Sequence, residues 1–152
     1  MSILTDFENM AEIYVKSKAY DGKAFCVVGI KEGDKSIVFH DIAFDGSIRM
    51  RDEQIPIKGV EANFQIMLYG VVWGLHLTND KEADIFIHSG VVASWINGDG
   101  RPPERYGALM GRLRQQLIGR KAVAWQVDYG AHRTMNHMLD RLINLVKRKK
   151  YA

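Results

Sequence analysis

Several features that anchor or cross-link other small proteins are scarce in this sequence. Its 152 residues include one cysteine, Cys26, and three prolines. No apolar run approaches the roughly 18 residues of a membrane span. A single cysteine excludes an internal disulfide, and the N-terminus lacks a basic segment followed by an apolar one. We therefore expect a soluble, cytoplasmic or otherwise intracellular protein in which Cys26 is a small buried apolar side chain.

The chain does contain enough apolar material for one globular core. Apolar residues make up 47% of its 152 residues, which is a suitable length for a single domain. The formal net charge is only +3, but arginines are concentrated in the C-terminal half and residues 148–150 are all basic. Uneven basic charge favours nucleic acid as a partner, although basic helix faces are also common on ordinary surfaces.

Apolar spacing predicts the order of the secondary-structure elements. Residues 3–14 have helical spacing and Thr5 with Glu8 forms a capping box, so we expect a helix over 6–16. Asp45-Gly46 is a strong hairpin signal between two strands. The remaining elements are strands over 24–30, 36–44, 47–55, 84–88 and 122–127, and helices over 62–77, from 91, over 106–118 and over 135–146.

One polar cluster lies at the end of a predicted buried strand. The strand over 84–88 ends in His88-Ser89-Gly90, directly before a helix. In α/β proteins this end of a strand usually carries the side chains for chemistry. A lone histidine there is more often a hydrogen-bonded structural residue than a base, and His88 with Asp140 supplies too few ligands for a metal centre.

The order of elements and three local motifs resemble the ribonuclease H-like fold. The Asp45-Gly46 hairpin is similar to the second and third strands of bacterial and plant-type members. The segment IHSGVVASWING is similar to the family's strand that ends in Asp-Ser before a short helix and a glycine. Asn136-His137-Met138-Leu139-Asp140 resembles the Asn-x-x-Ala-Asp motif that opens the family's last helix.

This resemblance covers about residues 23–146 and implies an α/β fold. The expected architecture is a five-stranded mixed sheet, with three antiparallel strands followed by two parallel ones, flanked by helices and preceded by an extra N-terminal helix. The implied organisation is a helical extension over residues 1–20, a ribonuclease H-like domain over 21–147 and a basic tail over 148–152.

The resemblance also implies positions for catalysis. Ribonucleases H cut the RNA strand of an RNA–DNA hybrid with two magnesium ions, held by carboxylates on the first strand, the first helix, the end of the fourth strand and the last helix. The matching positions here are Val28, Gln65, His88 and Asp140. Residues 24–31, 62–79 and 85–97 contain no acid, so a small shift of alignment does not restore the carboxylates. A neutral amide and an imidazole do not balance two divalent ions, so we expect no metal, no cofactor and no metal-dependent cleavage.

The resulting hypothesis is a pseudo-ribonuclease H that binds an RNA–DNA hybrid or structured RNA without cutting it. The expected nucleic-acid contacts are Asn63, Gln65, Ser89, His132, Arg133 and Asn136. Asn136 is also a candidate cap of the last helix. Two alternatives stay open: a structural or protein-binding module, including a homodimer formed through the N-terminal helix, and an active nuclease using Glu61, Asp41 and Asp140.

Overall fold

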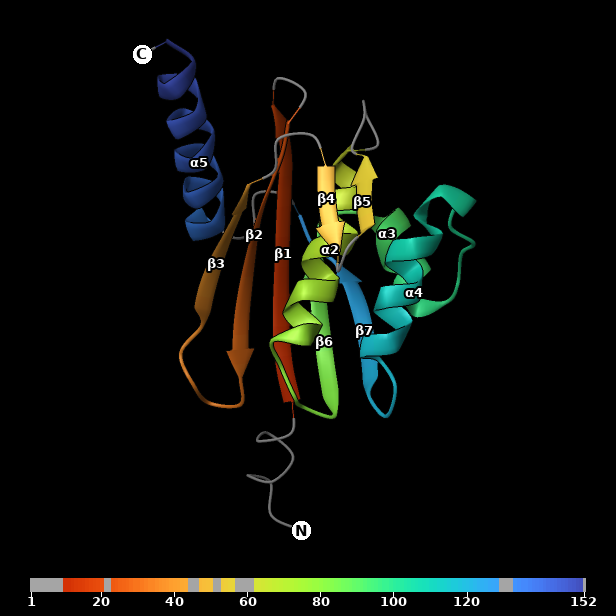
Figure 1. Ribbon diagram of the computed structural model, residues 1–152. Coiled ribbons are helices and arrows are strands. Elements are labelled where there is room, and N and C mark those ends of the chain that lie inside the picture. Colours follow the sequence, from red (N-terminus) through yellow and green to blue (C-terminus); the bar gives the residue numbers. More distant parts are fainter. Residues whose placement is uncertain are drawn as a thin grey trace.

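The computed structural model describes residues 10–20, 23–43, 47–50, 53–56, 62–128 and 133–151. Strands alternate with helices in the second half of the chain, as Figure 1 shows. In chain order the elements are β1 (Met10–Tyr20), β2 (Lys23–Glu32), β3 (Val38–Ala43), β4 (Ser47–Met50), β5 (Glu53–Pro56), α2 (Ala62–His76), β6 (Glu82–Ile87), α3 (Gly90–Asn97), the 3-10 helix η2 (Glu104–Tyr106), α4 (Gly107–Gln116), β7 (Lys121–Gln126) and α5 (Arg133–Tyr151).

The main sheet has five strands in the order β3-β2-β1-β6-β7. β2 pairs antiparallel with β1 and with β3, whereas β6 pairs parallel with β1 and with β7. This confirms the predicted sheet of three antiparallel strands followed by two parallel ones. β4 and β5 pair only with each other among the described residues, in a separate two-stranded sheet.

The predicted N-terminal helix is wrong over residues 10–16, and the rest of its range lies outside the described residues. Residues 10–20 form β1, the central strand of the sheet. Its buried apolar side chains recur at every second position, at Ala11, Ile13 and Val15. Ala11 and Tyr14 have helical spacing, whereas Ala11, Ile13 and Val15 have strand spacing. The segment forms a strand because it pairs with strands on both sides. Residues 10–16 therefore do not supply a helix for dimerisation.

Two other boundaries also change. The strand predicted over 47–55 is split into the β4–β5 hairpin, and β1 takes its place as the third antiparallel strand. Its apolar residues do not keep one phase, which is why a single continuous strand does not form there. At the other end of the chain, α5 continues to Tyr151, so residues 148–151 extend the last helix rather than form a separate tail.

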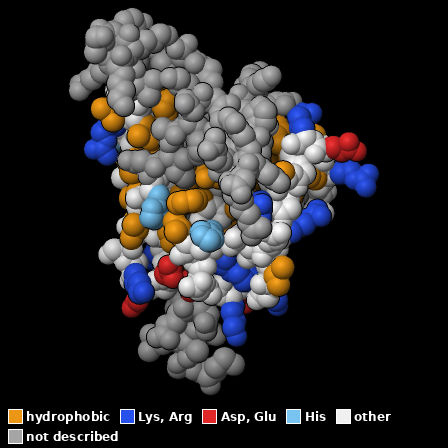
Figure 2. Space-filling view, viewed as in Figure 1, with side chains coloured by type: hydrophobic (Ala, Val, Ile, Leu, Met, Phe, Trp, Pro, Cys, Tyr) orange, Lys and Arg blue, Asp and Glu red, His pale blue; other side chains and the backbone are white. Residues whose placement is uncertain are grey.

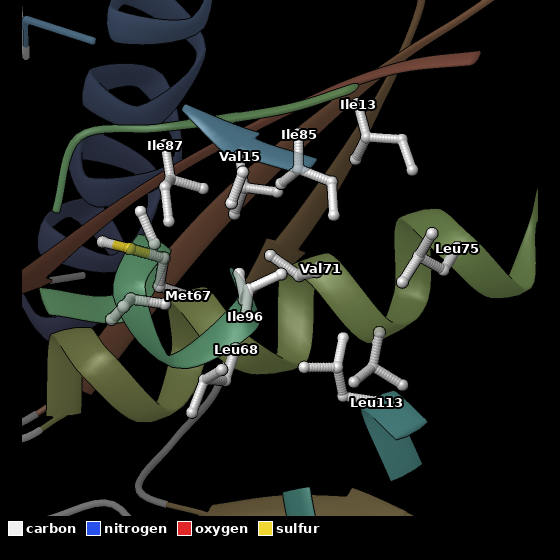
Figure 3. Close-up of a cluster of buried hydrophobic side chains, with 14 of the residues drawn as sticks. Ile13, Val15, Met67, Leu68, Val71, Leu75, Ile85, Ile87, Ile96 and Leu113 are labelled. Carbon is white, nitrogen blue, oxygen red and sulfur yellow. The ribbon is translucent and has the colours of Figure 1, made fainter. Parts of the chain in front are cut away.

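Helices cover both faces of the sheet. Successive β2 residues show this, because their side chains point to opposite faces. Val28 packs in a large core with residues of α2, α3 and α4, whereas Val27 packs in a smaller core with Met135, Leu139 and Ile143 of α5. Figure 3 shows strand side chains in the large core pointing toward those of α2. In the part of the chain that the structure describes, no helix is both long and apolar enough to span a membrane.

Candidate functional site at the ends of two parallel strands

The carboxyl end of β6 lies beside the middle of β1, where the pairing between these two strands ends. The two strands run parallel, with Tyr14 paired to Phe86, and the rings of these residues stack with their centroids 4.9 Å apart. Side chains two residues further on point to the same face of a strand. Continuing this register brings Lys16 of β1 opposite His88, the residue directly after β6.

Lys16 and His88 are electrostatically coupled. The side chain of Lys16 is 3% exposed, and burial lowers its pKa. His88 is half-buried, and its pKa lies below the usual 6.5, first because of burial and second because of the positive charge of Lys16. Burial and the positive charge of Lys16 therefore both favour the neutral imidazole of His88 over its protonated form. The site combines a buried lysine side chain with an imidazole ring.

The N-terminal half of α2 brings Asn63 to the end of β1. A Cβ atom on Gly70 would lie 2.7 Å from Val15 Cγ1, so the helix backbone runs directly against the strand. Two residues after Val15 on the same strand, Ser17 Oγ donates a hydrogen bond to the carbonyl oxygen of Asn63 (3.5 Å), near the start of the helix. Gln65 lies about 200° further around the helix than Asn63, on a different side. Its side chain is buried, and its Oε1 accepts no hydrogen bond from the described residues.

Helix α3 begins at the same edge of the sheet. Ser89 caps this helix, because its Oγ accepts a hydrogen bond from the backbone N–H of Val92 (3.2 Å). The hydroxyl keeps its own proton, so Ser89 can still donate. Ser89 follows His88 in the chain, and both residues are half-buried.

Helix α5 contributes Asp140, which forms an ion pair with a lysine of β1. Lys18 Nζ of β1 lies 3.7 Å from Asp140 Oδ1, and both side chains are about half exposed. Exposed pairs of this kind contribute about 0 to 1 kcal/mol, so this one positions the carboxylate only loosely. Arg133 lies exposed in the first turn of α5.

Asn136 does not cap α5. The helix begins at Arg133, so Asn136 lies inside it, one turn before Asp140. Its half-buried side chain has an Oδ1 that accepts no hydrogen bond from the described residues. His132, the other contact predicted just before this helix, lies outside the described residues.

The residues at this edge do not fit a pair of magnesium ions. The first strand of the sheet is β1, so the position predicted at Val28 of β2 moves to β1, where Lys16 lies in register with His88. Mg²⁺ takes hard oxygen ligands, and an ammonium repels it. Within the described ranges, no three His, Cys, Asp or Glu side chains are grouped closely enough to hold a metal ion.

The two described members of the alternative carboxylate set lie on different elements, β3 and α5. Asp41 belongs to β3, an edge strand separated from β6 by β2 and β1. Glu61 lies outside the described residues. Of the two described members, Asp140 reaches β1, through its ion pair with Lys18.

Comparison with known proteins identifies the fold. No family model and no curated protein matches the chain. Among solved structures, ribonuclease H1 from Halobacterium salinarum matches with a TM-score of 0.67 and 12% identity over 89% of this chain and 98% of its own. The N-terminal ribonuclease H domain of a Mycobacterium tuberculosis protein matches with a TM-score of 0.69 and 12% identity, covering 93% of this chain and 98% of that one.

A third solved structure contains nucleic acid. It is a ribonuclease H1 isolated from compost by a metagenomic approach, in complex with an RNA/DNA hybrid, with a TM-score of 0.54 and 12% identity over 88% of this chain and 99% of its own. Together with the sheet order, these likenesses show that the chain has a ribonuclease H-like fold.

Sequence reasoning missed Lys16, Ser17 and Lys18 because it placed residues 6–16 in a helix. A signal for them was present. Glu12, Tyr14 and Lys16 alternate with small and β-branched apolar residues, which is typical of a strand with one face in the core. The polar run at 16–18 in the second half of this strand indicates a candidate site there.

Proposed function

We propose that this chain binds nucleic acid, as an RNA–DNA hybrid or structured RNA, and does not cleave it through a metal pair. The observation that carries the proposal is Lys16 beside His88, at the place where the resemblance implies carboxylates. A buried cation at that place opposes divalent metal ions and favours the negatively charged backbone of a nucleic acid. The hybrid bound by one structural neighbour supports the choice of ligand.

The polar groups around this edge suit a sugar–phosphate backbone. Asn63 and Ser89 are half-buried amide and hydroxyl groups, which can hydrogen-bond to 2′-hydroxyls of an A-like duplex. Arg133 is exposed on the first turn of α5 and can reach a phosphate. Figure 2 shows further Lys and Arg side chains over the right and lower parts of the α2 face, where α4 lies.

The test is a titration of the purified chain against labelled RNA–DNA hybrid, double-stranded RNA and double-stranded DNA, at two salt concentrations with Mg²⁺ present. We expect retention of the hybrid or the RNA that weakens as salt rises, with no cleavage products. Arg133→Ala should weaken retention. Lys31→Ala is the matched control, because Lys31 lies beside Glu12 (4.0 Å), away from the carboxyl end of β1.

Two outcomes would contradict the proposal. Mg²⁺-dependent cleavage that is lost in Asp140→Asn would show that an inherited metal site operates. Absence of both retention and cleavage would instead favour the structural or protein-binding alternative.

A further inference from the structure

We infer that the group formed by Lys16, His88 and Ser89 is an anion site that takes one phosphate group without a metal ion. This inference rests on the proposed function for the source of that phosphate, a nucleic-acid backbone. It assigns to the protein's own ammonium group the charge that magnesium ions supply in metal-dependent relatives of this fold.

The geometry places three donors around one edge of the sheet. Lys16 lies opposite His88 when the register of the two parallel strands is continued two residues beyond its last pair, and Ser89 follows His88 in the chain. His88 and Ser89 are half-buried, whereas Lys16 is 3% exposed. A phosphate at this edge can therefore reach the half-buried imidazole and hydroxyl, while the buried ammonium acts on it through its charge.

Burial increases the effect of the ammonium. A charge in low-dielectric surroundings acts on its neighbours more strongly than a charge in water. The effect already reaches His88, whose lowered pKa reflects the charge of Lys16 in addition to burial. The same field that disfavours a second positive charge on His88 favours a negative charge beside it.

The surrounding charges favour an anion over a cation. On β1, the next side chain on the same face is Lys18, and its partner Asp140 is the carboxylate that the described residues bring to this end of the strand. The acidic side chains of Glu12 and Asp84 lie on the same face, but four residues before Lys16 and His88 on their strands. A tetrahedral oxyanion with several acceptor atoms matches donors of three kinds.

The decisive variant is Lys16→Met. Methionine has a similar length without the charge, so it should be accepted at a buried position, and cooperative urea unfolding will show that the variant folds. We expect its affinity for the RNA–DNA hybrid to fall roughly tenfold at about 0.1 M salt, and the slope of log K against log salt to decrease by about one. EDTA should leave the affinity of the unaltered chain unchanged.

Two further variants separate the site from general electrostatics. Lys31→Met removes the same charge at a partly exposed position beside Glu12, so it should change the affinity less than twofold. His88→Leu should weaken binding as Lys16→Met does, whereas His88→Asn keeps an N–H donor and should retain most of it. Equal losses in Lys16→Met and Lys31→Met would overturn the assignment.

The outcomes for the site and for the proposed function can be told apart. If the unaltered chain binds hybrid and Lys16→Met binds it equally well, the anion site is wrong while nucleic-acid binding stands. If the unaltered chain binds no nucleic acid, the chain is titrated with inorganic phosphate and the NMR signals of the His88 ring are followed. Saturable shifts that disappear in Lys16→Met would support an anion site for a free phosphate, and absence of shifts would reject it.

Discussion

At the scale of single residues, two glycines set the distance between α2 and the sheet. A Cβ atom on Gly74 would lie 2.5 Å from Ile13 Cγ2, and one on Gly70 would lie 2.8 Å from Cys26 Sγ. Real Cβ atoms do not approach other atoms this closely, so any larger residue would push the helix away from β1. The position of Asn63 at the end of β1 depends on this close contact.

We predict that Gly74→Ala destabilises the fold by about 1 to 3 kcal/mol. Overpacking against Ile13, which is fully buried, opposes the gain of about 1 kcal/mol that alanine usually gives inside a helix. Gly111→Ala is the matched control, because a Cβ on Gly111 of α4 meets nothing within 4 Å. It should stabilise by up to about 1 kcal/mol, as measured by urea unfolding. Equal effects of the two substitutions would show that α2 does not press on β1.

His88 should make stability depend on pH. The folded state lowers its pKa below 6.5, so between the two pKa values the unfolded chain binds a proton that the folded chain does not. Stability contributed by the neutral ring is therefore present above pH 6.5 and decreases as pH falls below it. The slope for one proton cannot exceed about 1.4 kcal/mol per pH unit. Urea unfolding between pH 5 and 7.5 measures this slope, and His88→Gln should flatten it. An unchanged slope in that variant would mean that other groups cause it.

At the scale of elements, one side chain joins α3 to the edge of the sheet. Asn97, the last residue of α3, donates a hydrogen bond from Nδ2 to the Ala124 carbonyl (2.9 Å) and accepts one at Oδ1 from the Ala124 N–H (2.8 Å). Its amide therefore occupies the outer backbone groups of β7, an edge strand. Edge strands with unpaired backbone groups are prone to pair with other chains, and this contact covers one of those places.

We predict that Asn97→Ala destabilises the fold by about 1 to 3 kcal/mol, because it leaves both groups of Ala124 without their partner in a partly buried position. Asn97→Asp keeps the acceptor and loses the donor, so it should have an intermediate effect. Asn79→Ala, at an exposed position just after α2, is the control and should change the free energy of unfolding by less than about 0.5 kcal/mol. Hydrogen exchange at the Ala124 amide should accelerate in Asn97→Ala alone. Protection that stays the same would contradict the role of Asn97.

Elements differ in how well their sequences specify them. α2, α3, β6 and β7 were predicted within a few residues, because each has one strong apolar period and clear turn residues at its ends. β1 was predicted as a helix. A short segment can match both the helical and the strand period, and here the pairing with β2 and β6 determines that it forms a strand. The error affected the candidate site as well. His88, Ser89 and Asn63 are predicted from local patterns, whereas placing Lys16 opposite His88 requires the strand register.

At the scale of the whole molecule, β1 connects the two halves of the sheet. It is the strand that pairs antiparallel with β2 on one side and parallel with β6 on the other. Its buried side chains Ala11, Ile13 and Val15 belong to the large core that α2, α3 and α4 also form. Without β1, the antiparallel pair β2–β3 and the parallel pair β6–β7 would have no shared strand, and α2 would lose much of the surface on which it packs.

A chain that begins at Asp21 should therefore not fold. We expect it to lose cooperative urea unfolding and most of its far-UV circular dichroism, since it lacks the central strand and three fully or nearly fully buried core residues. Ile13→Val is the graded control: it removes one methylene from the same strand and should destabilise by about 0.5 to 1.5 kcal/mol while the chain stays folded. If residues 1–20 were instead a separate helical extension, the shortened chain would unfold cooperatively at nearly the same urea concentration as the full chain. That result would contradict both the position of β1 and the Lys16–His88 site that depends on it.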